Sequence, residues 1–299
     1  MGTKVLLLIN NVLILACWTM TSSCLFAGTF PPQASVGGST AIPHDDIEII
    51  GWASSYSGYD PAGSGSSCDR GSNLTEIFET PEKTLGPAGN SNGANEGFTL
   101  DVVSLGRNGC ITLSFDSSIG NGPGWDFAVF ENGFFVTLPQ FGFLELAWVE
   151  VSSDGENFQR FDGITQASAP VGPFSNIMDA SDYDGLAGKY VAGFGTPFDL
   201  SDLPHDPLVD VNSITHIRIR DIVGDGSVTD NSNPPRVIFD PFATIDSAGF
   251  DLDAIAFRYS GQAQAPHFVA VPITGWTVVF SFMLITCVCC NRQIARKRH

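Results

Sequence analysis

Basic residues are scarce in this chain and unevenly placed. The 299 residues include 32 Asp and Glu but only 14 Lys and Arg, a formal net charge of −18. Five basic residues lie in the two terminal segments, at Lys4, Arg292, Arg296, Lys297 and Arg298, which leaves nine against 32 acids, a net of −23, in the middle. Such a surface repels phosphate backbones and argues against nucleic-acid binding. The acidity suits either solubility or the collection of divalent cations.

Catalytic motifs are also missing. There is no His-Glu-x-x-His, no cysteine pair at metal spacing in the middle region, and no glycine loop followed by lysine. Gly89–Gly93 fits G-x-S-x-G by letter but lacks the preceding strand and following helix of a nucleophile elbow. The sequence therefore favours a non-enzyme. A polysaccharide hydrolase stays open as an alternative, because a glycosidase needs only two carboxylates.

No long amphipathic helical pattern lies between the two ends, and short apolar runs alternate with Gly, Pro, Asn and Asp clusters. This pattern predicts an all-β domain over residues 47–262, preceded by a linker at 28–46. The expected strands are 47–52, 98–105, 110–115, 125–131, 143–151, 158–161, 214–223 and 250–257. Asn108-Gly109 favours a hairpin between 98–105 and 110–115, and 152–156 favours another between 143–151 and 158–161.

The stretch Gly122–Gly133 is apolar on both faces. Trp125, Phe127 and Val129 alternate with Ala128 and Phe130. A strand that is apolar on both sides lies between two layers. We therefore expect this strand at the centre of a β-sandwich.

Carboxylates stand at the ends of this and other expected strands. A buried carboxylate must be paired, hydrogen-bonded or bound to a metal. Because acidic strand ends are expected to meet at one rim of the sandwich, they predict a Ca²⁺ site, since calcium takes six to eight oxygen ligands. Arg218 or Arg220 could neutralise the acids of the last strand instead. The predicted metal ligands are Asp126, Glu131, Asp221, Asp251 and Asp253.

The N-terminus reads as a secretory signal. Residues 1–27 contain Lys4, an apolar region and small residues before a possible cleavage after Ala27. Lipoprotein processing at Cys17 or Cys24 and an uncleaved anchor are the alternatives.

The C-terminus predicts a membrane or sorting helix over residues 268–290, followed by a basic cytoplasmic tail at 291–299. This charge order places the acidic domain outside the cell, anchored in the envelope. The pentapeptide just inside the helix fits a sorting motif read by a protease or transpeptidase, with a plain single-pass anchor as the alternative. Its residues are Val271, Pro272, Ile273, Thr274 and Gly275.

Only Cys68 and Cys110 remain in the exported part of the chain. Two cysteines in an oxidising compartment predict one disulfide between them. In the chain-entropy model such a bond stabilises by about 3–4 kcal/mol.

Several blocks of the domain resemble a family of bacterial exported cell-surface proteins, many with PEP-CTERM-like sorting tails. The blocks are 104–106 with 111–115, 121–132 (Asn-Gly-Pro-Gly-Trp-Asp-Phe-Ala-Val-Phe-Glu-Asn), 150–155, 193–200, 221–224 and 249–254 (Gly-Phe-Asp-Leu-Asp-Ala). The resemblance implies a galactose-binding-like jelly roll. The chain departs from it between Val223 and Ala248.

Three functions are compatible with these features. The first is an envelope-anchored, calcium-stabilised binding or structural module for glycan or extracellular matrix. The second is the hydrolase, and the third is a purely architectural envelope protein. In the first, Tyr56, Tyr59, Phe134 and Phe135 either stack on sugar rings or belong to the core.

Overall fold

The computed structural model describes the greater part of the domain. The described residues are 28–61, 76–89, 101–135, 141–175, 177–242, 244 and 247–261. The predicted signal segment, sorting motif, membrane helix and basic tail lie outside them. Within the described part, no helix is both long enough and apolar enough to cross a membrane.

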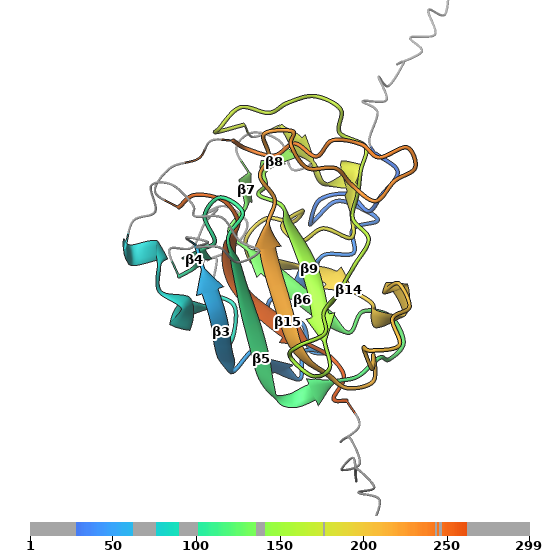
Figure 1. The fold of residues 1–299 in the computed structure, drawn as a ribbon. Helices are drawn as coiled ribbons and strands as arrows, with labels where there is room; N and C mark the ends of the chain where they lie inside the picture. The colour runs from blue at the N-terminus through green and yellow to red at the C-terminus, as the bar shows by residue number, and fades with distance from the viewer. Residues whose placement is uncertain are drawn as a thin grey trace, which may run out of the picture. The chain divides into compact units, whose positions relative to one another are not determined.

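Two antiparallel sheets make up most of the fold, as Figure 1 shows. The first sheet runs in the order β10 (Gln159–Arg160), β9 (Ala147–Ser152), β15 (Ile214–Asp221), β5 (Cys110–Ile119) and β3 (Ser55–Asp60). The second runs β1 (Ile42–Pro43), β14 (Phe194–Phe198), β6 (Phe127–Glu131), β16 (Asp251–Phe257) and β2 (Gly51–Trp52), and β4 (Val103–Ser104) also pairs with β16. The all-β class is confirmed.

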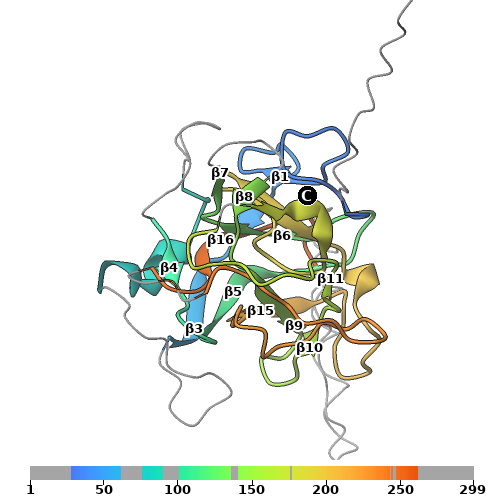
Figure 2. The same cartoon turned by 90° about the horizontal axis from the view of Figure 1, so that it is seen from above.

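Short elements close the ends of the two sheets (Figure 2). One small sheet pairs β11 (Ile164–Thr165) with β13 (Tyr183–Asp184), and another joins β12 (Met178–Asp179), β8 (Phe141–Phe143) and β7 (Phe134–Phe135). The described helical pieces are single 3₁₀ turns: η1 (Glu76–Phe78), η2 (Pro81–Thr84), η3 (Ala180–Asp182) and η4 (Leu200–Asp202).

The main core lies between the two sheets. Ile217 and Ile219 of β15 pack in one buried cluster with Val129 of β6 and Ile255 of β16. Alternate residues of β15 enter this core, while His216, Arg218 and Arg220 are only half-buried on the other face. This alternation is the one that the sequence predicts for a half-buried strand.

The central position expected for the apolar stretch is confirmed. All five residues of β6 are buried, and the strand lies between β14 and β16. Phe127 and Val129 enter the main core, and Ala128 and Phe130 enter a smaller cluster on the opposite face.

Two expectations about chain path are wrong. The strand ending at Ser104 does not form a hairpin with β5, because β4 pairs with β16 of the second sheet while β5 lies in the first. The turn residue Asn108 does have positive φ, but the chain uses this turn to cross between layers.

Residues 28–46 are also more than a linker, because β1 pairs with β14 and Gln33 is fully buried. The hairpin between β9 and β10 is confirmed.

The aromatic packing around Phe127 yields a prediction for stability. Its ring stacks on Phe198 at 5.2 Å between centroids and meets Phe161 edge-on at 5.9 Å. Phe127→Ala should lower the free energy of unfolding by about 3–5 kcal/mol, because a cavity is left in a closed core. Phe174→Ala, at a side chain that is 69% exposed, should change it by less than about 0.5 kcal/mol. Urea unfolding followed by tryptophan fluorescence compares the two, and equal effects would contradict the placement of β6.

Candidate functional site

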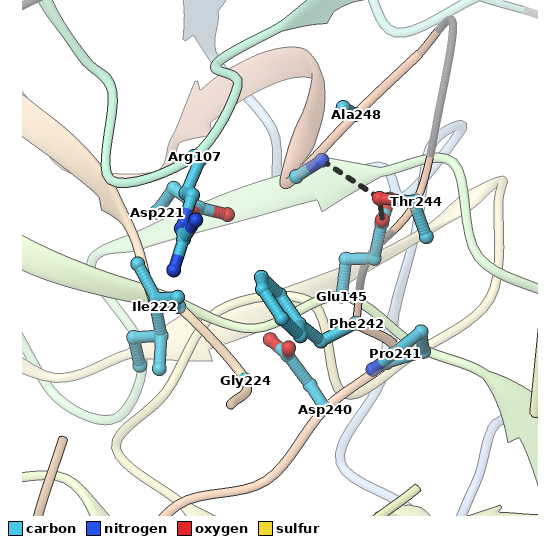
Figure 3. A pocket seen from close by; sticks show the side chains of 12 residues that line it. Arg107, Glu145, Asp221, Ile222, Gly224, Asp240, Pro241, Phe242, Thr244 and Ala248 are labelled. Atoms are coloured by element: carbon cyan, nitrogen blue, oxygen red, sulfur yellow. Dashed lines mark hydrogen bonds between the residues drawn. The ribbon is translucent and has the colours of Figure 1, made fainter. Parts of the chain in front are cut away.

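A small pocket lies where β15 and the segment before β16 meet. It is lined by Arg107, Glu145, Asp221, Ile222, Val223, Gly224, Asp240, Pro241, Phe242, Thr244, Ala248 and Gly249. The space inside has a volume of about 40 Å³. A single water molecule needs roughly 10–15 Å³ by the same measure, so the pocket has room for an ion with a few waters. Figure 3 shows the lining side chains.

Three of the lining side chains are buried carboxylates from different parts of the chain. Asp221 ends β15, Glu145 precedes β9, and Asp240 lies in the irregular segment between β15 and β16. Their residues are only 3%, 2% and 3% exposed. Burial to this degree removes most of the hydration of each carboxylate.

Backbone amides hold two of the carboxylates in place. Asp221 accepts hydrogen bonds from the amides of Asn108 at 2.7 Å and Phe250 at 2.8 Å, one on each oxygen. Asp240 accepts one from the amide of Leu146 at 3.0 Å. Asp221 therefore joins β15 to the start of β16, and Asp240 joins its loop to the start of β9.

Two glycines allow the backbone to approach these carboxylates. A Cβ on Gly224 would stand 1.7 Å from an oxygen of Asp240. A Cβ on Gly249, whose φ is +70°, would stand 2.7 Å from an oxygen of Asp221. The pocket walls are thus built to fit closely around the acids.

Glu145 is held by a side chain. Its Oε1 accepts a hydrogen bond from the hydroxyl of Thr244 at 3.1 Å, and that hydroxyl accepts from the amide of Gly249 at 3.2 Å (Figure 3). Within the described part of the chain, no donor reaches the second oxygen of Glu145 or Oδ1 of Asp240. Both acids line the pocket, so each brings to it a carboxylate with unused acceptor capacity.

Burial raises the pKa of each of the three acids that line the pocket. It raises the pKa of Asp221 to about 7, and the pKa values of Glu145 and Asp240 lie well above the usual range for the same reason. Repulsion from neighbouring acids adds to the shift at Glu145, with Asp251 and Glu131 the strongest contributors. Five buried acids therefore belong to one electrostatic cluster, which we call the carboxylate cluster: Glu131, Glu145, Asp221, Asp240 and Asp251.

The two cluster acids outside the pocket have their own donors. Asp251 accepts from the hydroxyls of Ser104 and Ser247 and from the side chain of Asn132, and burial still raises its pKa to about 7. Glu131 accepts from the amide of Gly133 at 2.7 Å, and burial places its pKa well above the usual range.

The convergence predicted from the sequence is therefore partly correct. Glu131, Asp221 and Asp251 do lie near one another at one end of the sandwich. Glu145 and Asp240 complete the group, and the sequence reasoning missed both. Glu145 is a charged residue in an otherwise apolar stretch between β8 and β9. This interruption is the sequence signal that could have marked it as a buried acid in need of a partner.

Asp126 is a correction, because it lies at the opposite end of β6 from Glu131. Five residues at roughly 3.3 Å each separate the two by about 16 Å. Asp126 accepts from the amides of Gly122 and Leu200, both at 2.7 Å. It joins the turn before β6 to η4 and lies apart from the acids at the other end of the strand.

Asp253 also differs from expectation. The register between β16 and β6 shifts between Leu252 and Ala254, so Asp253 sits at an irregularity and does not share Asp251's donors. One of its oxygens accepts from the amide of Gly89 at 2.8 Å, and burial raises its pKa to about 7. Neither Arg218 nor Arg220 serves as the counter-ion of Asp251 and Asp253, because both belong to the outer face of the first sheet, where Arg218 pairs with Glu150.

No three metal-binding side chains in the described ranges stand close enough together to hold an ion by themselves. A cation in the pocket would need water as part of its coordination shell, as many calcium sites do.

The aromatic residues considered for sugar stacking pack instead. Tyr56 and Tyr59 lie against the main core, and the hydroxyl of Tyr59 donates to the carbonyl of Ser104 at 2.9 Å. Phe134 stacks on Phe143 with ring centroids 4.9 Å apart, and Phe135 packs on the second buried cluster. All four side chains are half-buried, so each also keeps part of its surface in solvent.

Cys110 is disulfide-bonded. Cys68 lies outside the described residues, so the pairing of Cys68 with Cys110 stays a prediction.

Comparison with known proteins adds no relatives. The chain matches no family model, and comparisons with curated proteins and with solved structures gave no match.

The raised pKa values predict how stability depends on pH in the presence of a chelator. Between about pH 4 and pH 7 the folded chain holds protons on these acids that the unfolded chain has lost, so their contribution to the free energy of unfolding falls as pH rises. Glu145→Gln removes one such charge. At pH 8 it should raise the free energy of unfolding by about 1–3 kcal/mol, which is measured as a higher melting temperature. At pH 4.5 it should change the melting temperature little.

Asp154→Asn is the matched control. Hydrogen bonds from the amides of Asn157 and Glu156 and from the Asn157 side chain lower the pKa of this exposed acid, so its contribution has the opposite sign and is lost as pH falls. The control should therefore lower stability at pH 8. If Glu145→Gln destabilises equally at both pH values, Glu145 is not a charge that burial disfavours.

Proposed function

We propose that this protein is an envelope-tethered extracytoplasmic β-sandwich whose carboxylate pocket binds a divalent cation, Ca²⁺, and that the cation stabilises a binding or structural module. The observation that carries the proposal is the cavity with unused oxygens of Glu145 and Asp240 on its wall. The finer topology we propose is a galactose-binding-like jelly roll, supported by two antiparallel sheets over a common core.

The electrostatics of the pocket support a cation. Three carboxylates line one small space, and two more lie behind it. If all five ionise at neutral pH, their mutual repulsion and lost hydration cost several kcal/mol. A divalent ion is the ligand that reduces both costs at once, and hard oxygen donors are the ligands that Ca²⁺ prefers. Glu145, Asp221 and Asp240 would compensate its charge, and water would complete the coordination shell, because no three metal-binding side chains of the described residues stand close enough together to hold an ion by themselves.

The size of the pocket argues against larger ligands at this place. Sites for drug-sized ligands usually measure roughly 300–1,000 Å³. The space between the three carboxylates is far smaller, and their residues are almost fully buried. This pocket therefore does not offer the open cleft that a polysaccharide hydrolase needs, so the glycan or matrix ligand of the proposed module would bind elsewhere on the domain.

The proposed location rests on the sequence of the two ends. A signal-like segment at 1–27 and an apolar helix at 268–290 followed by four basic residues fit export and retention by the membrane. The sorting motif at 271–275 would be read by an envelope protease or transpeptidase. An acidic domain without nucleic-acid affinity suits this setting.

Calcium should stabilise the protein through the pocket. At pH 7.5, millimolar Ca²⁺ should raise the melting temperature of the full chain in mild detergent by several degrees, because a ligand at 100 times its Kd adds about 2.7 kcal/mol. Asp240→Asn should remove most of this shift, since it takes one charge from the pocket and keeps an acceptor for the amide of Leu146.

Asp126→Asn is the control for a buried acid outside the carboxylate cluster. It should lower stability, because Asp126 accepts two amides, yet keep the calcium-dependent shift. A wild-type melting curve that does not respond to calcium would overturn the cation site. Release of reducing sugar from a polysaccharide by the wild type, but not by Glu145→Gln, would favour the hydrolase instead.

The tether yields a separate prediction. Residues 264–299 contain the predicted membrane helix and basic tail and follow the described part of the sandwich. Removing 264–299 should move the protein from the membrane fraction to the soluble extracytoplasmic fraction, with the calcium-dependent melting shift unchanged. Fractionation with immunoblotting measures this, and a truncated chain that still sediments with membranes would argue against the helix as anchor.

A further inference from the structure

The outer face of the first sheet gathers positive charge in a domain that is otherwise strongly acidic. Three of the nine basic residues in the middle of the chain lie on it, Arg160 of β10 with Arg218 and Arg220 of β15. Each is half-buried and keeps part of its surface in solvent. In Figure 1 the molecule is seen from this side, with β5 and β15 in front of β6. A ligand can therefore reach these side chains.

The strand register places two of the arginines on either side of one acid. Arg160 of β10 is paired with Glu150 of β9, and Glu150 is paired in turn with Arg218 of β15. Neighbouring strands lie about 4.8 Å apart, so the three side chains form one row across the sheet. This row holds two positive charges against one negative charge.

Arg220 adds a third guanidinium beside this row. It lies two residues further along β15, on the same face. Burial lowers the pKa of Arg220, the carboxylate of Glu150 opposes this shift, and the charges of Arg218 and Arg160 add to it. The row of Arg220 continues through β5 to Asp60 of β3. The excess of positive charge is therefore greatest around Arg160 and Arg218.

Aromatic rings support both of these guanidinium groups. Arg160 lies over the ring of Trp148 at 4.1 Å from the centroid, and Arg218 lies over Phe158 at 3.9 Å. Arg218 also donates through Nε to Glu150. Among the described residues no acceptor reaches the guanidinium of Arg160, and Nε is the one nitrogen of Arg218 that is used. Both side chains are thus held in place with donors to spare, which reduces the entropy lost when a ligand binds.

Hydroxyl groups lie beside the arginines on the same face. Thr112 of β5 is paired with Arg218, and Ser57 of β3 is paired with Thr112. The next row holds Ser114 and Ser55, whose hydroxyls lie 2.7 Å apart. Both serines of β3 are exposed. The face therefore combines forked cationic donors with neutral hydroxyls, which are the groups that can recognise a carboxylate and the hydroxyls of a sugar ring.

An acidic polysaccharide fits this combination better than a nucleic acid does. A guanidinium binds a planar carboxylate through two parallel hydrogen bonds. A nucleic acid carries closely spaced phosphates, and the net charge of −23 in the middle of the chain repels so dense a polyanion. A polyuronate carries one carboxylate on each sugar, with neutral hydroxyls between. A few arginines are enough for it, because charges further away than about 8 Å are screened at physiological salt.

We propose that the outer face of the first sheet, centred on Arg160 and Arg218, binds the carboxylate groups of an acidic polysaccharide. The guanidinium groups donate to the carboxylates, and the hydroxyls of β5 and β3 bond to the sugar hydroxyls. This inference rests on the proposed function, because it names the ligand class of the extracytoplasmic module. It uses none of the residues of the carboxylate cluster, so the cation site and the polysaccharide site can be tested separately.

Biolayer interferometry of the full chain in mild detergent, over immobilised polygalacturonate, tests the proposal. A chelator in the buffer removes calcium from the protein and from the polysaccharide. The wild type should bind polygalacturonate and should not bind the same polysaccharide after methyl esterification of its carboxylates. Binding should weaken as NaCl is raised from about 50 to about 500 mM, because salt screens exposed charges.

Two variants should change the affinity in opposite directions. Arg160→Gln should weaken binding roughly 10-fold or more, the usual effect of losing a hydrogen bond between charged groups, and it leaves no paired acid behind. Arg160→Lys keeps the charge but loses the fork, so its affinity should lie between the two. Glu150→Gln should bind more tightly than the wild type, because it removes the acid that engages Arg218. A gain in affinity cannot arise from unfolding.

Arg258→Gln is the matched control. Arg258 also lies over a tryptophan ring, that of Trp125, but it follows β16 of the second sheet. This variant makes the same change in net charge as Arg160→Gln and should leave the affinity for polygalacturonate unchanged. An equal loss in both variants would mean that net charge alone decides binding, and the proposed face would be wrong.

The remaining outcomes separate this site from the cation site and from other partners. Equal binding of the methyl ester would rule out recognition of carboxylates. If the wild type ignores polygalacturonate but sediments as a larger species at low salt, and Arg160→Gln does not, the face docks an acidic surface of a second copy and the polysaccharide proposal is wrong. A calcium-dependent melting shift without polysaccharide binding would leave the cation site standing alone, and the reverse result would leave only the polysaccharide site.

Discussion

The burial of carboxylates against strands is the constraint on which the arrangement of this domain depends. Each buried acid must find donors, protons or a cation, because its hydration is lost. Asp221 meets this need by tying the turn at Asn108 and the start of β16 to the end of β15. Asp240 ties its loop to the start of β9. The acids therefore fix the loops at one end of the two sheets, and apolar packing fixes the sheets themselves.

The strands were predictable because their signals are local. Alternation in 214–221 and the double-sided apolar pattern of 127–131 predict both the existence and the burial of β15 and β6, and the structure confirms them. Which strand pairs with which is a long-range matter. Asn108-Gly109 looks like a hairpin signal, yet the flanking strands join different sheets, because Val103 and Leu105 find their core partners beside β16.

The candidate site was predictable only in part, for the same reason. Asp221, Asp251 and Glu131 could be recognised as acids at strand ends, but strand alternation says nothing about which end of the sandwich each occupies. Asp126 and Glu131 flank one strand, and only Glu131 joins the carboxylate cluster. Asp240 lies in a segment with no periodic pattern, so nothing local marked it. Its role depends on the close approach of Gly224, a contact between distant residues that appears only after folding.

Two buried acids, Asp126 and Glu145, show what turns such a residue into part of a candidate binding site. Asp126 uses both oxygens on backbone amides, and burial raises its pKa only to about 6. Burial raises the pKa of Glu145 well above its usual range, and four acidic neighbours raise it further, while a single hydroxyl donates to the side chain. The fold satisfies both oxygens of Asp126, whereas Glu145 and Asp240 of the carboxylate cluster each keep one oxygen without a donor in the described part of the chain. A compensating charge for the cluster must therefore come from protons, from Arg107 or from a bound cation.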